Sequence, residues 1–275
     1  MLRKFLLKMF LVFILVFTSA FSEERFIAVF NTLRLGKSEK DYLKMAKAIE
    51  NFDLVGLVEV MDKRGVEELA DNLQKITGEK WEYHISPYPV GHSSYKEYYG
   101  YIYKKKSIEF LGQKGYYPDV DKKFTRPPYG AEFKTDNFIF TFVLAHSIFG
   151  KQESQRRAEA FNYHRVYDYF KEIADENKKI ILGGDFNLPA VDEAFEKLTL
   201  NHKDNIVYAV DYRIKTTIGT KGFANSYDNI FLSKKLIPEF KGKSGAYDFT
   251  GGDYKYSREK VSDHIPVFIV VETGE

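Results

Sequence analysis

The sequence predicts a single domain of the α/β or α+β class, in which helices cover β-sheets. Segments with helical periodicity mix along the chain with short apolar segments. Several of the short segments are apolar on both faces, which is typical of strands buried beneath helices. No internal repeat and no long Pro/Gly/Ser stretch interrupts this pattern, so we expect one domain over residues 23–275.

The composition is that of a folded globular protein. The chain has 275 residues, of which 44% are hydrophobic and 29% are charged, and these fractions exclude disordered and low-complexity classes. The absence of cysteine excludes disulfide scaffolds, thiol nucleophiles, zinc fingers and iron–sulfur clusters. The formal net charge of +2 is not the strong positive charge of proteins that wrap nucleic acid. Composition alone therefore leaves the function open.

Residues 1–22 are expected to be a secretory signal peptide. Arg3, Lys4 and Lys8 form a basic region, an apolar run follows over residues 9–17, and residues 20–22 fit a small-x-small cleavage pattern. The alternative is a membrane anchor, but the apolar stretch is shorter than the ~20 residues of a spanning helix. We therefore expect a secreted or periplasmic protein. Cleavage removes three of the 41 basic residues, which leaves 38 against 39 acidic ones.

The individual elements follow from the period of the apolar residues. Short runs of bulky apolar residues predict strands at 25–31, 53–59, 81–85, 98–103, 138–146, 178–185, 227–232 and 265–271. Helical periodicity predicts helices at 38–52, 66–76 and 153–177, of which the last is the longest. We expect Ser38 to cap the first helix and Thr77-Gly78 to end the second.

Polar residues recur where the predicted strands end. These strand ends carry Asn31, Glu59, His146, Asp185 with Asn187, and Asp263-His264. Any one of them alone would be an ordinary polar loop residue. Because ligands bind beyond the strand ends of open sheets, their recurrence predicts one shared rim. Carboxylates and amides are ligands that Mg²⁺ or Ca²⁺ prefers, and histidines exchange protons near neutral pH.

The order of these motifs resembles a known superfamily. Gly183-Gly-Asp-Phe-Asn187, Tyr227-Asp-Asn-Ile230 and Ser262-Asp-His-Ile-Pro-Val267 occur in that order, each at a predicted strand end. Leu57-Val-Glu59 and Leu144-Ala-His146-Ser147 precede them. Together they are similar to the endonuclease/exonuclease/phosphatase superfamily and, within it, to deoxyribonuclease I-type nucleases. This resemblance implies an α+β fold, a four-layer αββα sandwich of two packed, mostly antiparallel sheets flanked by helices.

The resemblance also implies a metal-dependent hydrolysis of a phosphodiester by water. Glu59, Asn31 and Asp263 would hold Mg²⁺ or Mn²⁺, which acts as a Lewis acid on a phosphate oxygen. A structural Ca²⁺ elsewhere stays an open alternative. Asp185 and Asn187 would position water or a second cation and stabilise the charge of the transition state.

Two histidine–carboxylate pairs carry the implied proton transfers. His264, oriented by Asp228, would take the proton of the attacking water. His146, paired with Glu97, would protonate the leaving oxygen. A carboxylate behind each imidazole selects its tautomer and raises its basicity, as in a catalytic triad.

Two segments resemble substrate-binding parts of the secreted deoxyribonucleases. They are Ser94-Tyr-Lys-Glu97 and Arg126-Pro-Pro-Tyr129. The resemblance implies that Arg126 offers a bidentate fork to phosphate and that Thr217 contributes a hydroxyl contact, with Thr216 as the alternative. Tyr95 is a candidate for stacking on the substrate, and the alternative is an ordinary exposed tyrosine. We expect DNA as the substrate, with RNA or phospholipid left open, and a monomer without a stable protein partner.

The chain departs from those enzymes at two points. It lacks their disulfide, and Met61 stands where they carry an arginine that enters the DNA groove, unless Lys63 or Arg64 substitutes for it. Alternative functions are a sphingomyelinase-type phospholipase C or an inositol-phosphate phosphatase of the same superfamily. Exposed aromatic residues such as Phe149 would then face a membrane. A catalytically retired binding protein is a third alternative.

Overall fold

The strands of the protein form two sheets. The computed structural model describes residues 22–274 apart from 93–94, 175 and 177, so residues 1–21 of the predicted signal peptide lie outside the described residues. The first sheet consists of β1 (Glu23–Leu35), β2 (Leu54–Val60), β3 (Trp81–Ile85), β4 (Val90–His92), β5 (Tyr95–Lys104), β12 (Phe240–Ala246) and β13 (Val267–Thr273). The second consists of β6 (Glu109–Tyr116), β7 (Tyr129–Thr135), β8 (Phe138–His146), β9 (Ile180–Asp185), β10 (Ile206–Tyr208) and β11 (Asp228–Ser233).

The two sheets are mostly antiparallel. The strand order is β12-β13-β1-β2-β5-β3 in the first sheet, with β4 paired to β5, and β10-β11-β9-β8-β7-β6 in the second. Two pairs are parallel, β1 with β2 and β8 with β9. Within each parallel pair both strands end at the same edge of the sheet, so the polar residues at their carboxyl ends are neighbours.

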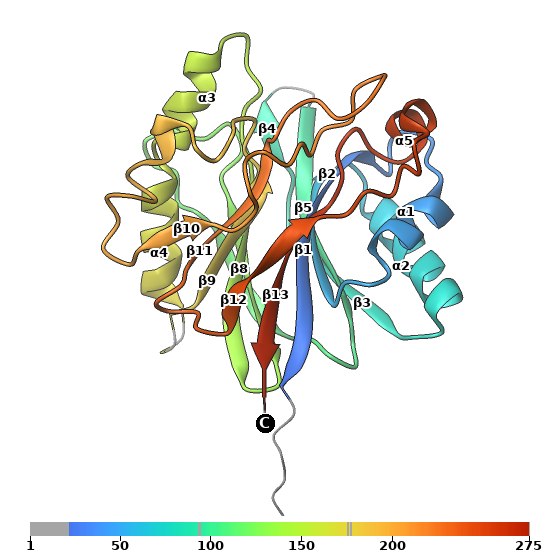
Figure 1. Ribbon diagram of the computed structural model, residues 1–275, viewed down its shortest axis with the longest axis horizontal. Coiled ribbons are helices and arrows are strands. Elements are labelled where there is room, and N and C mark those ends of the chain that lie inside the picture. The colour runs from blue at the N-terminus through green and yellow to red at the C-terminus, as the bar shows by residue number, and fades with distance from the viewer. Residues whose placement is uncertain (1–21, 93–94, 175, 177, 275) are drawn as a thin grey trace, which may run out of the picture.

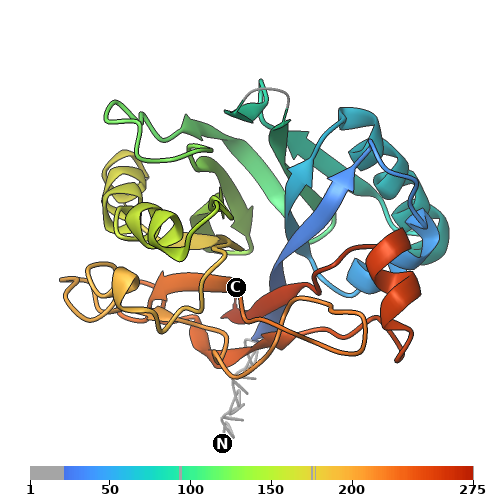
Figure 2. The same ribbon diagram turned by 90° about the horizontal axis from the view of Figure 1, so that it is seen from above.

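Helices cover the outer faces of both sheets (Figures 1 and 2). On the side of the first sheet lie α1 (Tyr42–Ile49), α2 (Lys63–Thr77) and α5 (Tyr254–Lys260), and on the side of the second lie α3 (Glu153–Ala160) and α4 (Tyr163–Ile173). A short 3-10 helix covers Glu193–Phe195. The layers therefore follow the order helix, sheet, sheet, helix, which confirms the predicted four-layer sandwich.

Three apolar clusters hold the layers together. The central cluster lies between the sheets and includes Val29, Tyr101, Phe140 and Ile230. A second cluster packs α1 and α2 against the first sheet, and a third packs α4 against the second. Strands such as β2 and β8 contribute to clusters on both of their faces, which explains why their sequences are apolar throughout.

Two details of the predicted helices are wrong. The predicted long helix is interrupted between α3 and α4, where the Asn162 side chain donates to the carbonyl oxygen of Ala158 at 2.8 Å. Such side-chain bonds to the main chain compete with helix continuation. The first helix begins at Tyr42 and is capped by Asp41, not by Ser38, whose hydroxyl donates to main-chain carbonyls of the preceding turn.

Gly184 in β9 is expected to tolerate no larger side chain. A Cβ atom there would lie 1.8 Å from the carbonyl oxygen of Ala145 in the neighbouring strand β8. We expect Gly184→Ala to lower the free energy of unfolding by about 3 kcal/mol, because the clash is with main chain in a paired ladder. Gly100→Ala is the matched control, since its Cβ would first meet Val60 at an ordinary 3.5 Å. Equal urea midpoints for the two variants would contradict this expectation.

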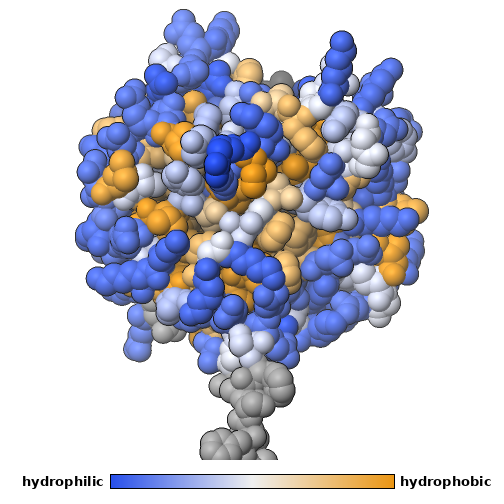
Figure 3. Space-filling view, viewed as in Figure 1, coloured by the Kyte–Doolittle hydropathy of each residue, from blue (hydrophilic) through white to orange (hydrophobic). Residues whose placement is uncertain are grey.

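The surface mixes polar and apolar side chains. Figure 3 shows hydrophilic residues around one face of the molecule, with apolar residues in small groups between them. Among the described residues, no helix is long and apolar enough to cross a bilayer.

Candidate active site

The polar strand ends of both sheets meet at one edge of the sandwich. Glu59 and Glu97 come from β2 and β5 of the first sheet, and His146 and Asp185 come from β8 and β9 of the second. A cavity of about 350 Å³ lies at this edge, and Glu59, His146 and Asp185 line it, while Glu97 is buried behind His146. Among the predicted site residues, the cavity is lined by Glu59, His146, Asp185, Asn187, Thr217, Asp263 and His264.

Each of the two predicted catalytic histidines is hydrogen-bonded to a buried carboxylate. The Nδ1 atom of His146 lies 2.7 Å from Oε1 of Glu97, and the Nδ1 atom of His264 lies 2.7 Å from Oδ2 of Asp228. Glu97 and Asp228 are fully or almost fully buried. Because Nδ1 of each imidazole is held by a carboxylate, Nε2 is the atom left to exchange a proton in the cavity.

Asp185 lies between the two imidazoles. Its Oδ2 atom is 3.6 Å from Nε2 of His146 and 3.6 Å from Nε2 of His264. The same oxygen accepts a hydrogen bond from Nδ2 of Asn31 at 3.1 Å, and Oδ1 accepts one from the main-chain N–H of Asn187 at 2.9 Å. The carboxylate is thus held from both sheets, with one histidine on either side.

The carboxylates control the protonation of the histidines. Burial lowers the pKa of His264, but the negative charges of Asp228 and Asp185 outweigh burial and raise this pKa to about 10. Burial and the charge of Arg126 lower the pKa of His146, but Glu97 outweighs both, so this pKa is also raised. Both imidazoles therefore bind a proton more strongly than an ordinary histidine does.

The Glu59 carboxylate is held at the cavity by two side chains. Its Oε1 atom accepts from Nδ2 of Asn31 at 3.2 Å, and its Oε2 atom accepts from the Tyr95 hydroxyl at 2.8 Å. The backbone of Glu59 has a left-handed φ of 60°, a strained conformation for a residue with a side chain. Such strain is found where the surrounding structure over-determines a functional position.

Asn31 differs from its predicted role as a metal ligand. Its oxygen accepts from the main-chain N–H of Leu33 at 3.0 Å, and its nitrogen faces Glu59 and Asp185. In this orientation Asn31 positions the two carboxylates and offers the cavity no oxygen.

The donor set of the cavity fits a hard divalent cation. Glu59, Asp185 and Asp263 supply carboxylate oxygens. Asp185, Asp228 and His264 have ligating atoms within 4.8 Å of one another, whereas Glu59, Asp185 and Asp263 form no such close group among the described residues. We favour the three carboxylates that line the cavity, because Oδ2 of Asp228 is already bonded to His264. A cation beside Asp185 and Asp263 would offset the charges of these two carboxylates and so lower the pKa of His264, while Asp228, the strongest of the charges that raise this pKa, would stay bonded to Nδ1.

Arg126 and Thr216, the alternative to Thr217, have different surroundings from those expected of substrate-binding residues. The guanidinium of Arg126 is buried and donates to the main-chain carbonyls of His146 and Ser147 at 2.9 and 2.7 Å. Its predicted fork to phosphate is therefore occupied by main chain, and Arg126 positions the His146 segment. Thr217 lines the cavity, where its hydroxyl oxygen accepts from the main-chain N–H of Asn225 at 2.8 Å, and its contact to substrate stays a prediction. Thr216 does not line the cavity, but its hydroxyl donates to Oδ2 of Asp228 at 2.6 Å and so positions the His264 partner.

Lys63 and Arg64, the two residues that could replace the groove arginine missing at Met61, both contact other side chains of the protein. Arg64 pairs with Asp62 at 2.9 Å, and Nζ of Lys63 lies 5.2 Å from the centre of the Tyr98 ring. A cation that sequence reasoning missed is Arg34, which lies with Met61 on the wall of a separate small cavity, its guanidinium carbon 5.6 Å from the Tyr95 ring centre. No spacing rule pointed to Arg34, because its approach to Tyr95 of β5 depends on the pairing of β1 with β2 and of β2 with β5.

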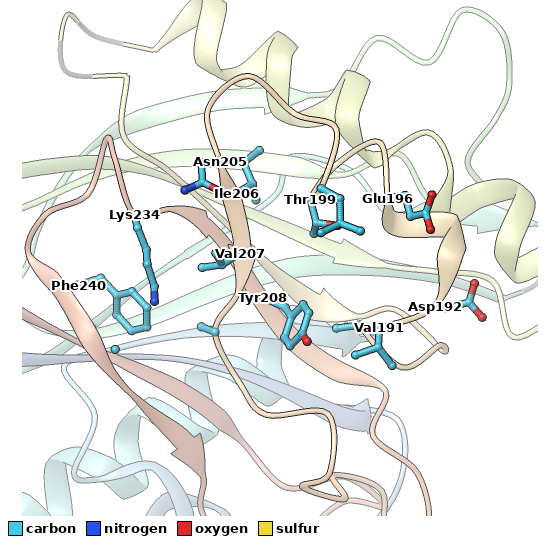
Figure 4. Close-up of a pocket in the computed structure, with 14 residues that line it drawn as sticks. Val191, Asp192, Glu196, Thr199, Asn205, Ile206, Val207, Tyr208, Lys234 and Phe240 are labelled. Carbon is cyan, nitrogen blue, oxygen red and sulfur yellow. The ribbon is translucent and has the colours of Figure 1, made fainter.

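A larger cavity, of about 540 Å³, lies outside this site (Figure 4). Its wall includes Val191, Tyr208, Lys234 and Phe240, and none of the predicted site residues lines it. It has no paired histidine and carboxylate among its lining residues. The chemistry therefore belongs to the smaller cavity at the strand ends.

Comparisons with known proteins agree with the fold and the motifs. No family model matches the chain. A protein named deoxyribonuclease from Thioalkalivibrio sp. (strain K90mix) is 28% identical over 278 residues, which cover 95% of this chain and 74% of that protein. Deoxyribonuclease gamma from Rattus norvegicus is 28% identical over 286 residues, which cover 94% of this chain and 87% of that protein.

The fold is shared with solved structures. The endonuclease/exonuclease/phosphatase from Bacteroides vulgatus superposes with a TM-score of 0.61 at 19% identity, over 92% of this chain and 100% of that one. The sequence relatives and the shared αββα sandwich confirm the resemblance that the motifs indicated. In sequence and in fold the chain is similar to deoxyribonuclease I-like members of the endonuclease/exonuclease/phosphatase superfamily.

Proposed function

We propose that the protein is a secreted, metal-dependent endonuclease that hydrolyses the phosphodiester bonds of DNA. The observation that carries this proposal is the pair of histidines on either side of Asp185, each backed by its own buried carboxylate. One histidine can accept a proton while the other donates one, which is what in-line displacement at phosphorus requires. The deoxyribonuclease names of the sequence relatives support DNA as the substrate.

The proposed reaction begins with the removal of a proton from water by Nε2 of His264. The water oxygen attacks phosphorus, and the bond from phosphorus to the leaving oxygen breaks on the opposite side. Nε2 of His146 gives its proton to that leaving oxygen, so the products are a phosphate monoester and an alcohol. Asp228 and Glu97 keep the two imidazoles in the tautomers that these transfers need.

A divalent cation would be held by Glu59, Asp185 and Asp263, which offer carboxylate oxygens to the cavity. When bound, it supplies Lewis-acid stabilisation of the negative charge on the phosphate. Asn31 and Tyr95 keep Glu59 in place for that role. Asn187, whose side chain donates to the carbonyl of Ser147 at 2.9 Å, orders the loop that follows His146.

The direct test is plasmid nicking by the protein lacking residues 1–22. We expect relaxed and then linear plasmid with Mg²⁺ or Mn²⁺, no cleavage with EDTA, and recovery when metal is added back. RNA and sphingomyelin vesicles are run beside the plasmid, since both remain alternatives. Hydrolysis of sphingomyelin without nicking of DNA would exclude the proposed endonuclease and favour a phospholipase C. The absence of any hydrolysis would favour a binding protein.

We also propose that residues 1–22 direct export and are removed. The basic and apolar residues of this segment support the proposal. Amino-terminal sequencing of the protein recovered from the medium or periplasm is expected to begin at residue 23. Recovery of the full-length chain with the membrane fraction would show an anchor instead.

A further inference from the structure

Phe149 is an exposed aromatic side chain on the wall of the catalytic cavity. Its exposed fraction is 61%, and it lines the same cavity as His146 and Asn187. It lies in the segment between β8 and α3, three residues after His146. Most of the ring is not used for packing, so a ligand with a flat apolar face can cover it.

Arg156 in α3 holds this ring in place. Its guanidinium carbon lies 4.8 Å from the centre of the Phe149 ring, within the range of a cation–π contact. Its NH1 group donates to the carbonyl of Asn187 at 3.1 Å and to the Tyr227 hydroxyl at 3.3 Å. Phe149 is therefore tied through Arg156 to the loop after β9 that carries Asn187.

The positive charge of Arg156 is not neutralised by a carboxylate. In the part of the chain that the structure describes, Arg156 forms no salt bridge, and its Nε atom is buried without a hydrogen-bond partner. The neighbouring Arg157, by contrast, pairs with Glu153 at 3.0 Å and with Asp192 at 3.0 Å. An aromatic face and an uncompensated cation thus lie together beside the reacting groups.

We propose that Phe149 is a stacking platform for a nucleobase next to the scissile phosphate, and that the protein consequently prefers single-stranded to duplex DNA. This inference rests on the proposed nuclease function and specifies its substrate. Every base has an aromatic face, so stacking on a protein side chain is tolerant of sequence. In a duplex both faces of a base are covered by its neighbours, and a base must leave the stack before Phe149 can reach it. A single strand avoids that cost.

The surroundings of Phe149 favour a nucleotide over a membrane. The next residues, Gly150, Lys151 and Gln152, provide no apolar surface that would enter a lipid layer together with the ring. The ring is fixed by Arg156 at the wall of the catalytic cavity, where a base attached to the reacting phosphate would lie. A membrane contact would instead need a larger, continuous apolar patch.

The test compares kcat/KM for a short single-stranded oligonucleotide, its duplex and an abasic strand of the same length, which has the phosphodiesters without the nucleobases. We expect Phe149→Ala to lower kcat/KM for the single strand about 5- to 150-fold more than for the abasic strand, which is the range for one stacked base. Phe149→Trp should restore most of the loss. Equal losses on both substrates, or a larger loss on the duplex than on the single strand, would overturn the proposal.

Phe161→Ala is the matched control. Phe161 is 45% exposed and has Nζ of Lys197 4.2 Å from its ring centre, but it does not line the catalytic cavity. This variant should keep wild-type rates on all three substrates. If it loses single-strand cleavage as Phe149→Ala does, the effect is not specific to the cavity wall and the proposal fails.

A binding measurement separates this inference from the proposed function. The anisotropy of a fluorescent single strand is measured with EDTA, so that no hydrolysis is needed. Weaker binding by Phe149→Ala than by Phe161→Ala supports the platform even if the wild-type protein cleaves no phosphodiester, in which case only the nuclease proposal fails. Unchanged oligonucleotide binding, or a loss confined to sphingomyelin vesicles, overturns the platform.

Discussion

Replacement of His264 by alanine is expected to lower kcat for DNA hydrolysis by about 10²- to 10⁴-fold, the range for loss of a positioned general base. Its Nε2 atom faces the cavity, and its Nδ1 atom is bonded to the buried Asp228 at 2.7 Å. No other described histidine lies where it could replace this one, except His146 on the far side of Asp185. Rates are measured on a single-stranded oligonucleotide and on plasmid, with circular dichroism to verify the fold.

The choice of leaving group distinguishes the roles of the two histidines. The p-nitrophenolate ion leaves without protonation, so His146→Ala should lose much less activity on bis(p-nitrophenyl) phosphate than on DNA. His264→Ala should lose activity on both substrates, because the attacking water must still give up its proton. If His264→Ala instead retains activity on bis(p-nitrophenyl) phosphate and His146→Ala loses it, His146 is the general base and His264 the general acid. His164→Ala is the control, since His164 does not line the catalytic cavity and its Nδ1 atom lies 2.8 Å from the main-chain carbonyl oxygen of Phe161.

Replacement of Glu59 by glutamine is expected to raise the metal concentration that supports half-maximal activity by at least about tenfold. The substitution removes a negative charge from the cavity. It also leaves one of two donors, Nδ2 of Asn31 or the Tyr95 hydroxyl, facing an NH₂ group instead of an oxygen. Activity should recover partly at high Mg²⁺ or Mn²⁺, because Asp185 and Asp263 remain.

Metal binding itself is measured by calorimetric titration of Mn²⁺ into each variant. Tyr95→Phe should weaken binding less than Glu59→Gln, since it removes a hydrogen bond and leaves the charge. Glu68→Gln, on the exposed face of α2, should bind Mn²⁺ like the wild type. Wild-type affinity in Glu59→Gln would show that this carboxylate is not a metal ligand.

The local sequence predicted much of the fold because strand and helix signals are local. Strand β3 begins and ends where its bulky residues predict, and Gly78 ends α2 in a left-handed conformation. The break between α3 and α4 escaped prediction, since the apolar period continues across it. It depends on a side-chain bond from Asn162 that competes with the helical ladder. Edge strands such as β10, with three residues, carry too little pattern to recognise.

The sequence also predicted one part of the candidate site and missed another. The residue types that can carry the chemistry, and their positions at strand ends, are visible in the motifs around Asp185, Asp228 and His264. The contacts between side chains cannot be read from these motifs. Arg126 matched a phosphate-binding segment, but its fork binds the main chain of the His146 segment. Arg156 carried no motif at all, and only the packing of α3 brings it to Phe149.

The sequence by itself determined the alternation of strands and helices, the order of the polar strand ends and the resemblance to a superfamily, because each depends on neighbours along the chain. Only the tertiary structure decided that two imidazoles lie on either side of one carboxylate. That arrangement joins His146 and Asp185 of one sheet to Glu97 and Asn31 of the other. The physical reason is that the relative position of two sheets is set by the packing of the apolar cluster between them, which no local pattern records.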